Sequence, residues 1–270
     1  MTQDWEYKGT NLTTYAYNVQ LLGTGAEVPA RRGENIVVPG KTGRHLTTSK
    51  PLDERRVSLA MWVKDVNPST GGSASESQLL SNLDTLRQVF SSSGTGLLKH
   101  TMGGTARQAA AEVVSSVAFE PFGTAPYYRY VVEFSMANPF WRAETARTAT
   151  GTITSSPQNV TLVNNGTYRC EDGTVQITGQ IVDPKFTIGD DWVQYTGTVS
   201  AGGTLVINCG SWVATNGTVD VSGDISHDGD LVWLPIPVGT AVTMVVTGSS
   251  IGTAVGGVPV VTISHLEAFI

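Results

Sequence analysis

The chain of 270 residues has little charge, little cysteine and no long apolar run. Only 15% of its residues are charged, and its two cysteines are Cys170 and Cys209. No stretch approaches the roughly 18 apolar residues that a membrane-spanning helix needs, so no membrane span is expected. The first residues show no basic segment followed by an apolar run, so we expect no secretory signal. Two reduced, buried thiols are therefore favoured, with a disulfide as the alternative.

Motifs of metal-dependent and phosphate-binding sites are also missing. The chain contains no His-Glu-x-x-His, no Walker loop and no Gly-x-Gly-x-x-Gly. Its four histidines are scattered, and neither cysteine has a partner at metal-site spacing. A catalytic triad meets only in space and escapes such a search. We expect a protein that is not an enzyme and that uses no cofactor or metal.

The charge is divided unevenly between the two halves. Residues 1–150 carry 15 basic and 13 acidic residues, a balance of +2, whereas residues 151–270 carry two basic and 10 acidic residues, a balance of −8. Such a step predicts two domains. Because affinity for nucleic acid comes largely from Lys and Arg, the acidic half argues against phosphate-backbone contacts, and we expect no sequence-specific nucleic-acid binding.

The first half combines strands with one helix. Residues 55–63 and 127–136 alternate apolar and polar residues in the pattern of half-buried strands, and shorter strands are predicted over 18–22, 35–39, 97–100 and 112–119. A stripe of apolar residues predicts a helix over about 76–91, with Ser75 and Gln78 at the spacing of a capping box. The Gly- and Ser-rich residues 67–75 before it are expected to form an exposed loop.

The second half is β-rich throughout. Short Val, Ile and Thr runs alternate with turn sequences such as Asn-Gly-Thr at 165–167 and 216–218, which favours an antiparallel sandwich. The polar stretch between the halves predicts domains at 1–145 and 152–270, joined by a linker at 146–151. The fold class is mainly β, with a barrel- or sandwich-like first domain followed by a β-sandwich.

Four motifs occur in order along both halves of the chain. They are Val-Pro-Gly-Lys-Thr-Gly at 38–43, Phe-Ser-Met-Ala-Asn-Pro-Phe-Trp at 134–141, the hairpin over 192–209, and Trp-Leu-Pro-Ile-Pro-Val-Gly at 233–239. In this order they resemble the distal tail protein family of siphophages: the first resembles an early turn of that family, the second the end of its first domain, and the last two its second domain. Cys170 departs from the pattern, because many relatives place a proline-led turn there.

The resemblance implies a structural component of the virion, located at the phage tail tip and assembled in the host cytoplasm. It implies a ring-forming first domain, six copies of which close into a hub, and a galectin-like second domain. The ring would join the tail tube protein to tail-tip and fibre proteins, with DNA passing through its lumen. A carbohydrate-binding module, or a β-sandwich that binds a host-cell glycan, is the alternative from another class.

Two groups of residues are candidates for contacts in the ring or with partners. Asn138, Pro139, Phe140 and Trp141 would anchor an interface or, equally, fasten the end of the first domain. Arg31, Arg32, Arg55 and Arg56 stand beside acidic residues and would pair across subunits or mark solvated strand ends. The loop 67–75 would embrace a neighbouring subunit.

Three tryptophans and four aspartates of the second half have alternative interpretations. Trp192 and Trp233 are expected in the core, whereas Trp212 follows a turn and is the candidate platform for a glycan. Asp220, Asp224, Asp228 and Asp230 would offer oxygens to Ca²⁺, but a solvated turn is favoured, and no metal site is predicted.

Overall fold

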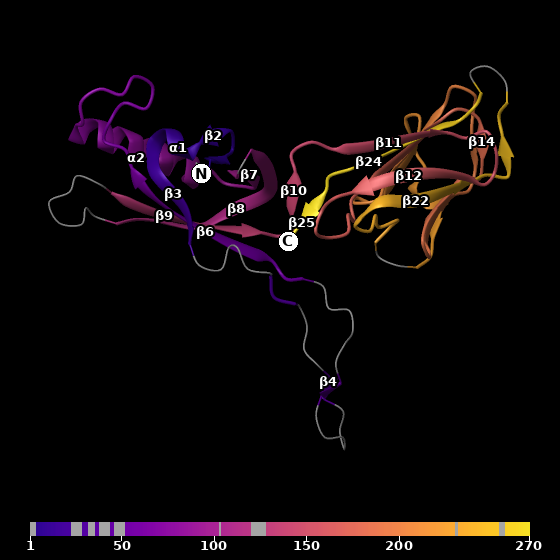
Figure 1. Ribbon diagram of the computed structural model, residues 1–270, viewed down its shortest axis with the longest axis horizontal. Coiled ribbons are helices and arrows are strands. Elements are labelled where there is room, and N and C mark those ends of the chain that lie inside the picture. The colour runs from indigo at the N-terminus through magenta and orange to yellow at the C-terminus, as the bar shows by residue number, and fades with distance from the viewer. Residues whose placement is uncertain are drawn as a thin grey trace. The chain divides into compact units, whose positions relative to one another are not determined.

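The computed structural model describes residues 4–22, 29–31, 36–37, 44–45, 52–102, 104–119, 128–229, 232–253 and 257–270. The chain divides into two compact units, one of Met1–Trp141 with Ile270 and one of Arg142–Phe269. Both units consist mainly of antiparallel strands, with few helices, so the predicted fold class is confirmed (Figure 1).

The first unit is built on one open antiparallel sheet that forms a half-barrel. Its strands follow the spatial order β2-β1-β7-β8-β9-β6-β3. Their bounds are β1 Asp4–Tyr7, β2 Thr10–Asn11, β3 Ala16–Leu22, β6 Arg55–Val63, β7 Gly96–Met102, β8 Thr105–Phe119 and β9 Arg129–Met136. A separate pair consists of β4 Ile36–Val37 and β5 Arg44–His45. The edges of the main sheet are β2 and β3.

One face of this sheet is covered by α2, Glu76–Ser91, whose bounds match the predicted helix. Its buried stripe includes Leu79, Leu83, Leu86 and Phe90. The Phe90 ring lies 5.5 Å from the Tyr130 ring and 6.1 Å from the Phe134 ring, measured between centroids. Burial of such large rings supplies much of the free energy that holds a helix on a sheet. A short helix that the sequence did not predict, α1 Leu12–Tyr15, precedes β3.

The capping of α2 follows half of the predicted capping box. Ser75 Oγ accepts a hydrogen bond from the Gln78 backbone N–H at 3.2 Å, as expected. The Gln78 side chain does not return to Ser75; its Nε2 donates to Asn82 Oδ1 at 3.0 Å. Asn82 in turn donates to the carbonyls of Lys64 and Val66, so the helix is tied to the segment that follows β6.

The second unit contains a six-stranded and a five-stranded antiparallel sheet (Figure 1). The first follows the order β11 Arg147–Thr152, β24 Val260–His265, β13 Thr174–Thr178, β18 Thr204–Asn208, β19 Val213–Asn216 and β20 Val219–Asp220. The second follows β12 Gln158–Asn164, β22 Gly239–Thr247, β15 Lys185–Ile188, β16 Asp191–Tyr195 and β21 Ile225–His227. Smaller elements are β10 Trp141–Ala143, β14 Ile181–Val182, β17 Thr198–Val199, β23 Ser250–Ile251, β25 Ala268–Phe269 and the 3-10 turn η2 Ser222–Asp224.

Strands of both large sheets contribute to one apolar core. Ile177 and Val261 come from the six-stranded sheet, and Phe186 and Met244 come from the five-stranded sheet; all four are fully buried. Trp233 joins this core at 8% exposure, as predicted. Trp192 is only half-buried, and its ring is covered by Lys185, whose Nζ lies 4.0 Å from the ring centroid.

Both cysteines are free thiols buried in this core. Cys170 Sγ donates to Asp172 Oδ1 at 3.0 Å. Burial, and after it the charge of Asp172, raises the pKa of each thiol to about 12.

Residues 147–151 of the predicted linker at 146–151 lie in strand β11, and the chain divides into its two units between Trp141 and Arg142. The side chains of β11 are small or polar and mostly exposed, because the strand lies at the edge of its sheet. A strand of that composition has no alternation of apolar residues, so its sequence resembles a linker.

Candidate assembly surface

The face of the first sheet that points away from α2 carries charged side chains at the start of β6. In this strand the side chains alternate, so Arg55 and Arg56 point to opposite faces. Arg55 is 4% exposed, and burial lowers its pKa. Arg56 lies on the outward face, with 56% of its side chain exposed. Of these two candidate interface residues, Arg56 alone is placed to meet another chain.

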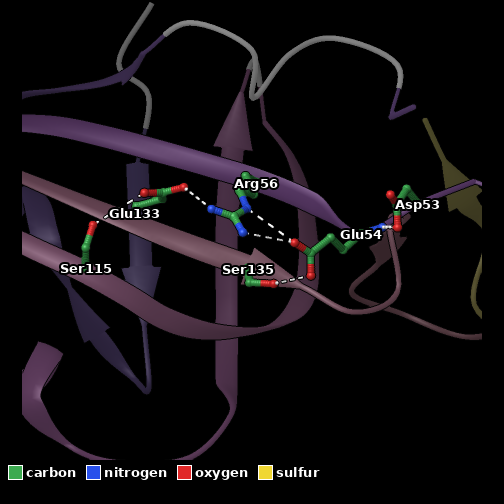
Figure 2. Close-up of polar contacts among 6 residues, drawn as sticks. All are labelled: Asp53, Glu54, Arg56, Ser115, Glu133 and Ser135. Atoms are coloured by element: carbon green, nitrogen blue, oxygen red, sulfur yellow. Dashed lines mark hydrogen bonds and ion pairs between the residues drawn. The ribbon is translucent and has the colours of Figure 1, made fainter. Parts of the chain in front are cut away.

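Arg56 is the centre of an outer-face network that also contains Glu54, Ser115, Glu133 and Ser135 (Figure 2). Arg56 Nε donates to Glu54 Oε1 at 3.2 Å, and Arg56 Nη1 donates to Glu133 Oε1 at 3.3 Å. Ser135 Oγ donates to Glu54 Oε2 at 3.3 Å, and Ser115 Oγ donates to Glu133 Oε2 at 3.4 Å. The network therefore ties β6 to β9 and β8 across the sheet.

Hydrogen bonds from Arg56 to Glu54 and then Glu133 raise the pKa of its guanidinium. One cation faces two carboxylates, so the network carries a formal charge of −1 at neutral pH. Exposed ion pairs contribute little to the stability of a single chain, about 0–1 kcal/mol each. Stabilisation of the single chain therefore does not account for this network.

Aromatic residues occupy the other end of the same outward face. Trp62 on β6 pairs with Tyr17 on β3 and with Arg129 on β9, so these three side chains share one face of the sheet. Trp62 is half-buried and Tyr17 is 37% exposed. At the opposite end, a register shift in β8 between Val113 and Ser115 contains Val114, which is half-exposed and adjoins Ser115 of the outer-face network. The face thus combines exposed aromatic area with paired charge, a composition typical of protein interfaces.

Most side chains of the predicted anchor segment, residues 138–141, are buried against the first unit. Phe140 and Trp141 are 7% and 8% exposed, and the Trp141 ring meets the Trp5 ring edge-on at 6.1 Å between centroids. Pro139 is buried, whereas Asn138 is exposed and its Oδ1 accepts from the Phe140 backbone N–H at 3.2 Å. This packing favours the fastening role; an interface role for the segment stays a prediction.

The remaining candidates for subunit contacts are only partly described. Arg31 is exposed and forms an isolated antiparallel bridge with Leu52. Arg32 and the run 38–43 lie outside the described residues. The loop 67–75 is mostly exposed as expected, and within it Asn67 and Gly71 bond to each other through both backbone groups.

In the second unit, Trp212 is 53% exposed and has a backbone φ of +57°, which is unusual for a bulky residue. It is therefore the exposed aromatic that the sequence predicted. Asp220 binds the Ser222 hydroxyl and backbone N–H, and these hydrogen bonds lower its pKa. Among the described residues no group of three or more metal-ligating side chains occurs, and Asp230 lies outside them.

One catalytic spacing was missed in the sequence. Residues 248–252 read Gly-Ser-Ser-Ile-Gly, the spacing of a hydrolase nucleophile, which an exposed strand-to-helix turn must present. Ser250 instead lies in β23, opposite Val182 of β14, and no helix follows among the described residues. The match therefore lacks the structural context of a nucleophile. No helix in the described part of the chain has both the length and the apolarity to cross a membrane.

Comparison with solved structures shows what this fold is similar to. The Dit protein of phage SPP1, described as a paradigm of the hub adsorption apparatus in phages that infect Gram-positive bacteria, superposes with a TM-score of 0.71 at 12% identity. The alignment covers 100% of both chains. At this identity the likeness establishes a shared fold over the full length.

Other comparisons add less. Structures of the activated phage P2 baseplate, with Ca and with Sr, give TM-scores of 0.47 and 0.48 at 9% identity, covering 99% of this chain and 98% of the other, too weak a likeness to carry a conclusion. No family model matches the chain, and no curated protein sequence matches it significantly.

Proposed function

We propose that this chain is a distal tail protein, a non-enzymatic structural subunit that closes with its own copies into a hub ring at the tip of a phage tail. The observation that carries the proposal is the fold likeness to the SPP1 Dit protein over the whole of both chains. The order of sequence motifs, from the segment ending at Trp141 to the run 233–239, supports the same assignment.

The first unit would supply the ring contacts. Its sheet is open and ends in β2 and β3, and unpaired edges favour contact with a neighbouring chain. A head-to-tail contact repeated around a closed ring leaves no free interface. The outward face, with Arg56 at one end and Trp62 at the other, is the surface that we assign to the neighbouring copy.

In the assembled tail, the ring would be a hexamer that joins the tail tube protein above to tail-tip or fibre proteins below. DNA would leave through its lumen. The second unit would project from the ring, and its excess of acidic side chains suits a basic partner protein. The chain would thus act by position and assembly, with no reaction step of its own.

The experiment is the solution mass of the purified full chain by light scattering, across concentration and salt, with electron microscopy of any large species. We expect a discrete ring of hexamer mass, built from chains of 28.6 kDa. A strict monomer up to the solubility limit, unchanged when the tail tube protein of the same phage is added, would contradict the proposal.

A free carbohydrate-binding module is the second candidate, favoured by the exposed ring of Trp212. It predicts a monomer whose glycan binding is lost in Trp212→Ala. Glycan-array binding that survives this substitution would remove Trp212 from any sugar site.

A further inference from the structure

The second unit contains a pocket of about 450 Å³ beside the edge strands β11 and β12. Ligand sites in proteins commonly have volumes of about 300–1,000 Å³, so this pocket has room for a small molecule. Thr145, Arg147 and Thr148 line one side, Thr161 lines another, and His265 and Glu267 form its buried part. None of the proposed ring contacts lies among these residues.

His265 is a buried polar side chain whose position calls for a partner. It is 5% exposed, and by strict hydrogen-bond geometry neither ring nitrogen has a partner; the Val163 backbone lies near enough to raise its pKa but not in good hydrogen-bond geometry. On β24 it follows Val261 and Ile263 on the same face, so the apolar row of the core ends in an imidazole at the pocket. A buried polar group without a well-placed partner is destabilising, and a ligand or water in the pocket would relieve that cost.

Arg147 lies directly opposite His265 in the pairing of β11 with β24, so both side chains are on one face of the sheet. Arg147 Nε donates to Glu267 Oε1, and the same oxygen accepts from the Asn165 backbone N–H at 2.9 Å. The Arg147 side chain is 46% exposed, and among the described residues its terminal Nη groups make no hydrogen bond. These donors therefore remain available beside the buried Glu267 carboxylate.

We propose that this pocket binds a neutral saccharide through Arg147, His265 and Glu267. Vicinal hydroxyls of a sugar each donate and accept, and they match a donor and an acceptor held side by side. Arg147 and Glu267 provide that donor and acceptor side by side, and an uncharged imidazole adds one donor and one acceptor. The threonine hydroxyls at the rim extend the same pattern.

The charge of the pocket favours a neutral ligand over an ion. The cation of Arg147 is balanced by the anion of Glu267. Burial is the largest influence on the pKa of His265 and lowers it. Glu267, the Val163 backbone and Asp172 act to raise this pKa, and Arg147 acts to lower it. His265 is therefore uncharged at neutral pH, and the formal charge of the site is zero. An anion would meet the Glu267 carboxylate, and a cation would meet the Arg147 guanidinium.

No aromatic residue lines the pocket, so the ring-stacking contribution to sugar affinity is missing and binding is expected in the millimolar range. The test is a titration of the full chain with glucose, galactose, rhamnose and N-acetylglucosamine, followed by saturation-transfer NMR. Acetate and inorganic phosphate are titrated in parallel. At least one sugar is expected to bind, and both anions are expected to bind at least about tenfold more weakly.

Arg147→Met is expected to weaken sugar binding at least about tenfold, because it removes charge-assisted hydrogen bonds. Arg169→Met is the matched control: Arg169 forms an exposed pair with Glu171 in the same unit and does not line the pocket. Thr161→Val, which preserves shape, is expected to weaken binding about threefold. Thermal unfolding of each variant checks that it is folded.

Absence of sugar binding by the wild-type chain would overturn the proposal, as would binding of acetate or phosphate alone. Equal loss in Arg147→Met and Arg169→Met would also overturn it. The proposal does not rest on the ring, because the mass measurement and the titration are independent: a chain that fails to assemble can still bind sugar.

Discussion

The two units cover their sheets in different ways. In the second unit, the two large sheets share one apolar core, and uncharged threonine pairs recur across strands elsewhere, such as Thr150 with Thr262 and Thr178 with Thr204. In the first unit, α2 covers one face of a single sheet, and the opposite face carries the outer-face network and the half-buried Trp62. The two units have comparable cores but different outward chemistry.

This difference shows where contacts with other chains are expected. The threonine pairs of the second unit satisfy one another locally, and the exposed apolar residues of that unit, such as Trp212 and Val219, lie elsewhere on it. Paired charge on the same face as an aromatic residue has little effect on a lone chain but directs and strengthens association when another surface excludes the water. Under the proposed function, we therefore expect the ring contacts to come from the first unit.

The largest expected effect comes from removing one large aromatic ring from the core of each unit. Phe134→Ala in the first unit and Phe186→Ala in the second are each expected to lower the free energy of unfolding of their own unit by about 3–5 kcal/mol. Calorimetry should show two transitions, each moved by one variant only. A shift of both transitions by either variant would show that the units unfold as one.

Reversing the charge at Arg56 tests the outward face itself. Arg56→Glu places a third carboxylate beside Glu54 and Glu133, so we expect ring assembly to weaken at least about tenfold in light scattering. Arg87→Glu is the matched control, because Arg87 also forms an exposed ion pair, with Asp84 on α2. Assembly that survives Arg56→Glu unchanged would exclude this face from the interface.

Mild acid is expected to weaken both units, each through one histidine whose pKa is lowered: the half-buried His100 in the first unit and the buried His265 in the second. Burial, with Arg107, lowers the pKa of His100, which stacks on Trp5 at 4.1 Å, and burial lowers the pKa of His265. Each histidine stays neutral in the folded chain while the unfolded chain takes up a proton below its ordinary pKa of about 6.5. Stability is therefore complete above that pH and falls as the pH drops from there toward the folded pKa.

His100→Phe preserves the ring stack and removes the proton. In this variant the first unit should lose less stability between about pH 7 and pH 5.5, while the second unit keeps its acid sensitivity. Thermal unfolding at several pH values measures both. An unchanged pH dependence of the first unit would show that other groups govern it.

The smallest expected effect concerns the helix cap. Ser75→Ala removes the acceptor for the Gln78 backbone N–H and should lower the stability of the first unit by about 1 kcal/mol. Ser77→Ala, at the second residue after Ser75, serves as the control because its hydroxyl caps no backbone group among the described contacts. The second unit should be unaffected by both.

Elements with a strong local pattern could be predicted from the sequence. The stripe of α2 and the alternation of β6 gave correct bounds, because each pattern reports directly which face is buried. Strand β11 and the short helix α1 were missed, since an exposed edge strand and a single turn bury too little apolar area to leave a pattern.

The outer-face network could be predicted only in part. The sequence singled out Arg55 and Arg56, but their opposite orientations follow from the strand, and the partner Glu133 comes from another strand through its register. The pocket residues Arg147 and His265 were not recognised for the same reason: they are 118 positions apart and meet only through the pairing of β11 with β24.

The buried thiols have a practical consequence for site-specific labelling. Thiolates, not thiols, react with maleimides and iodoacetamide, and a pKa of about 12 leaves Cys170 and Cys209 almost wholly protonated at neutral pH. The native chain should thus be inert to these reagents while folded. A single cysteine introduced at exposed Arg87 could carry a fluorophore without removal of the native pair, so that energy transfer between copies would report assembly in real time.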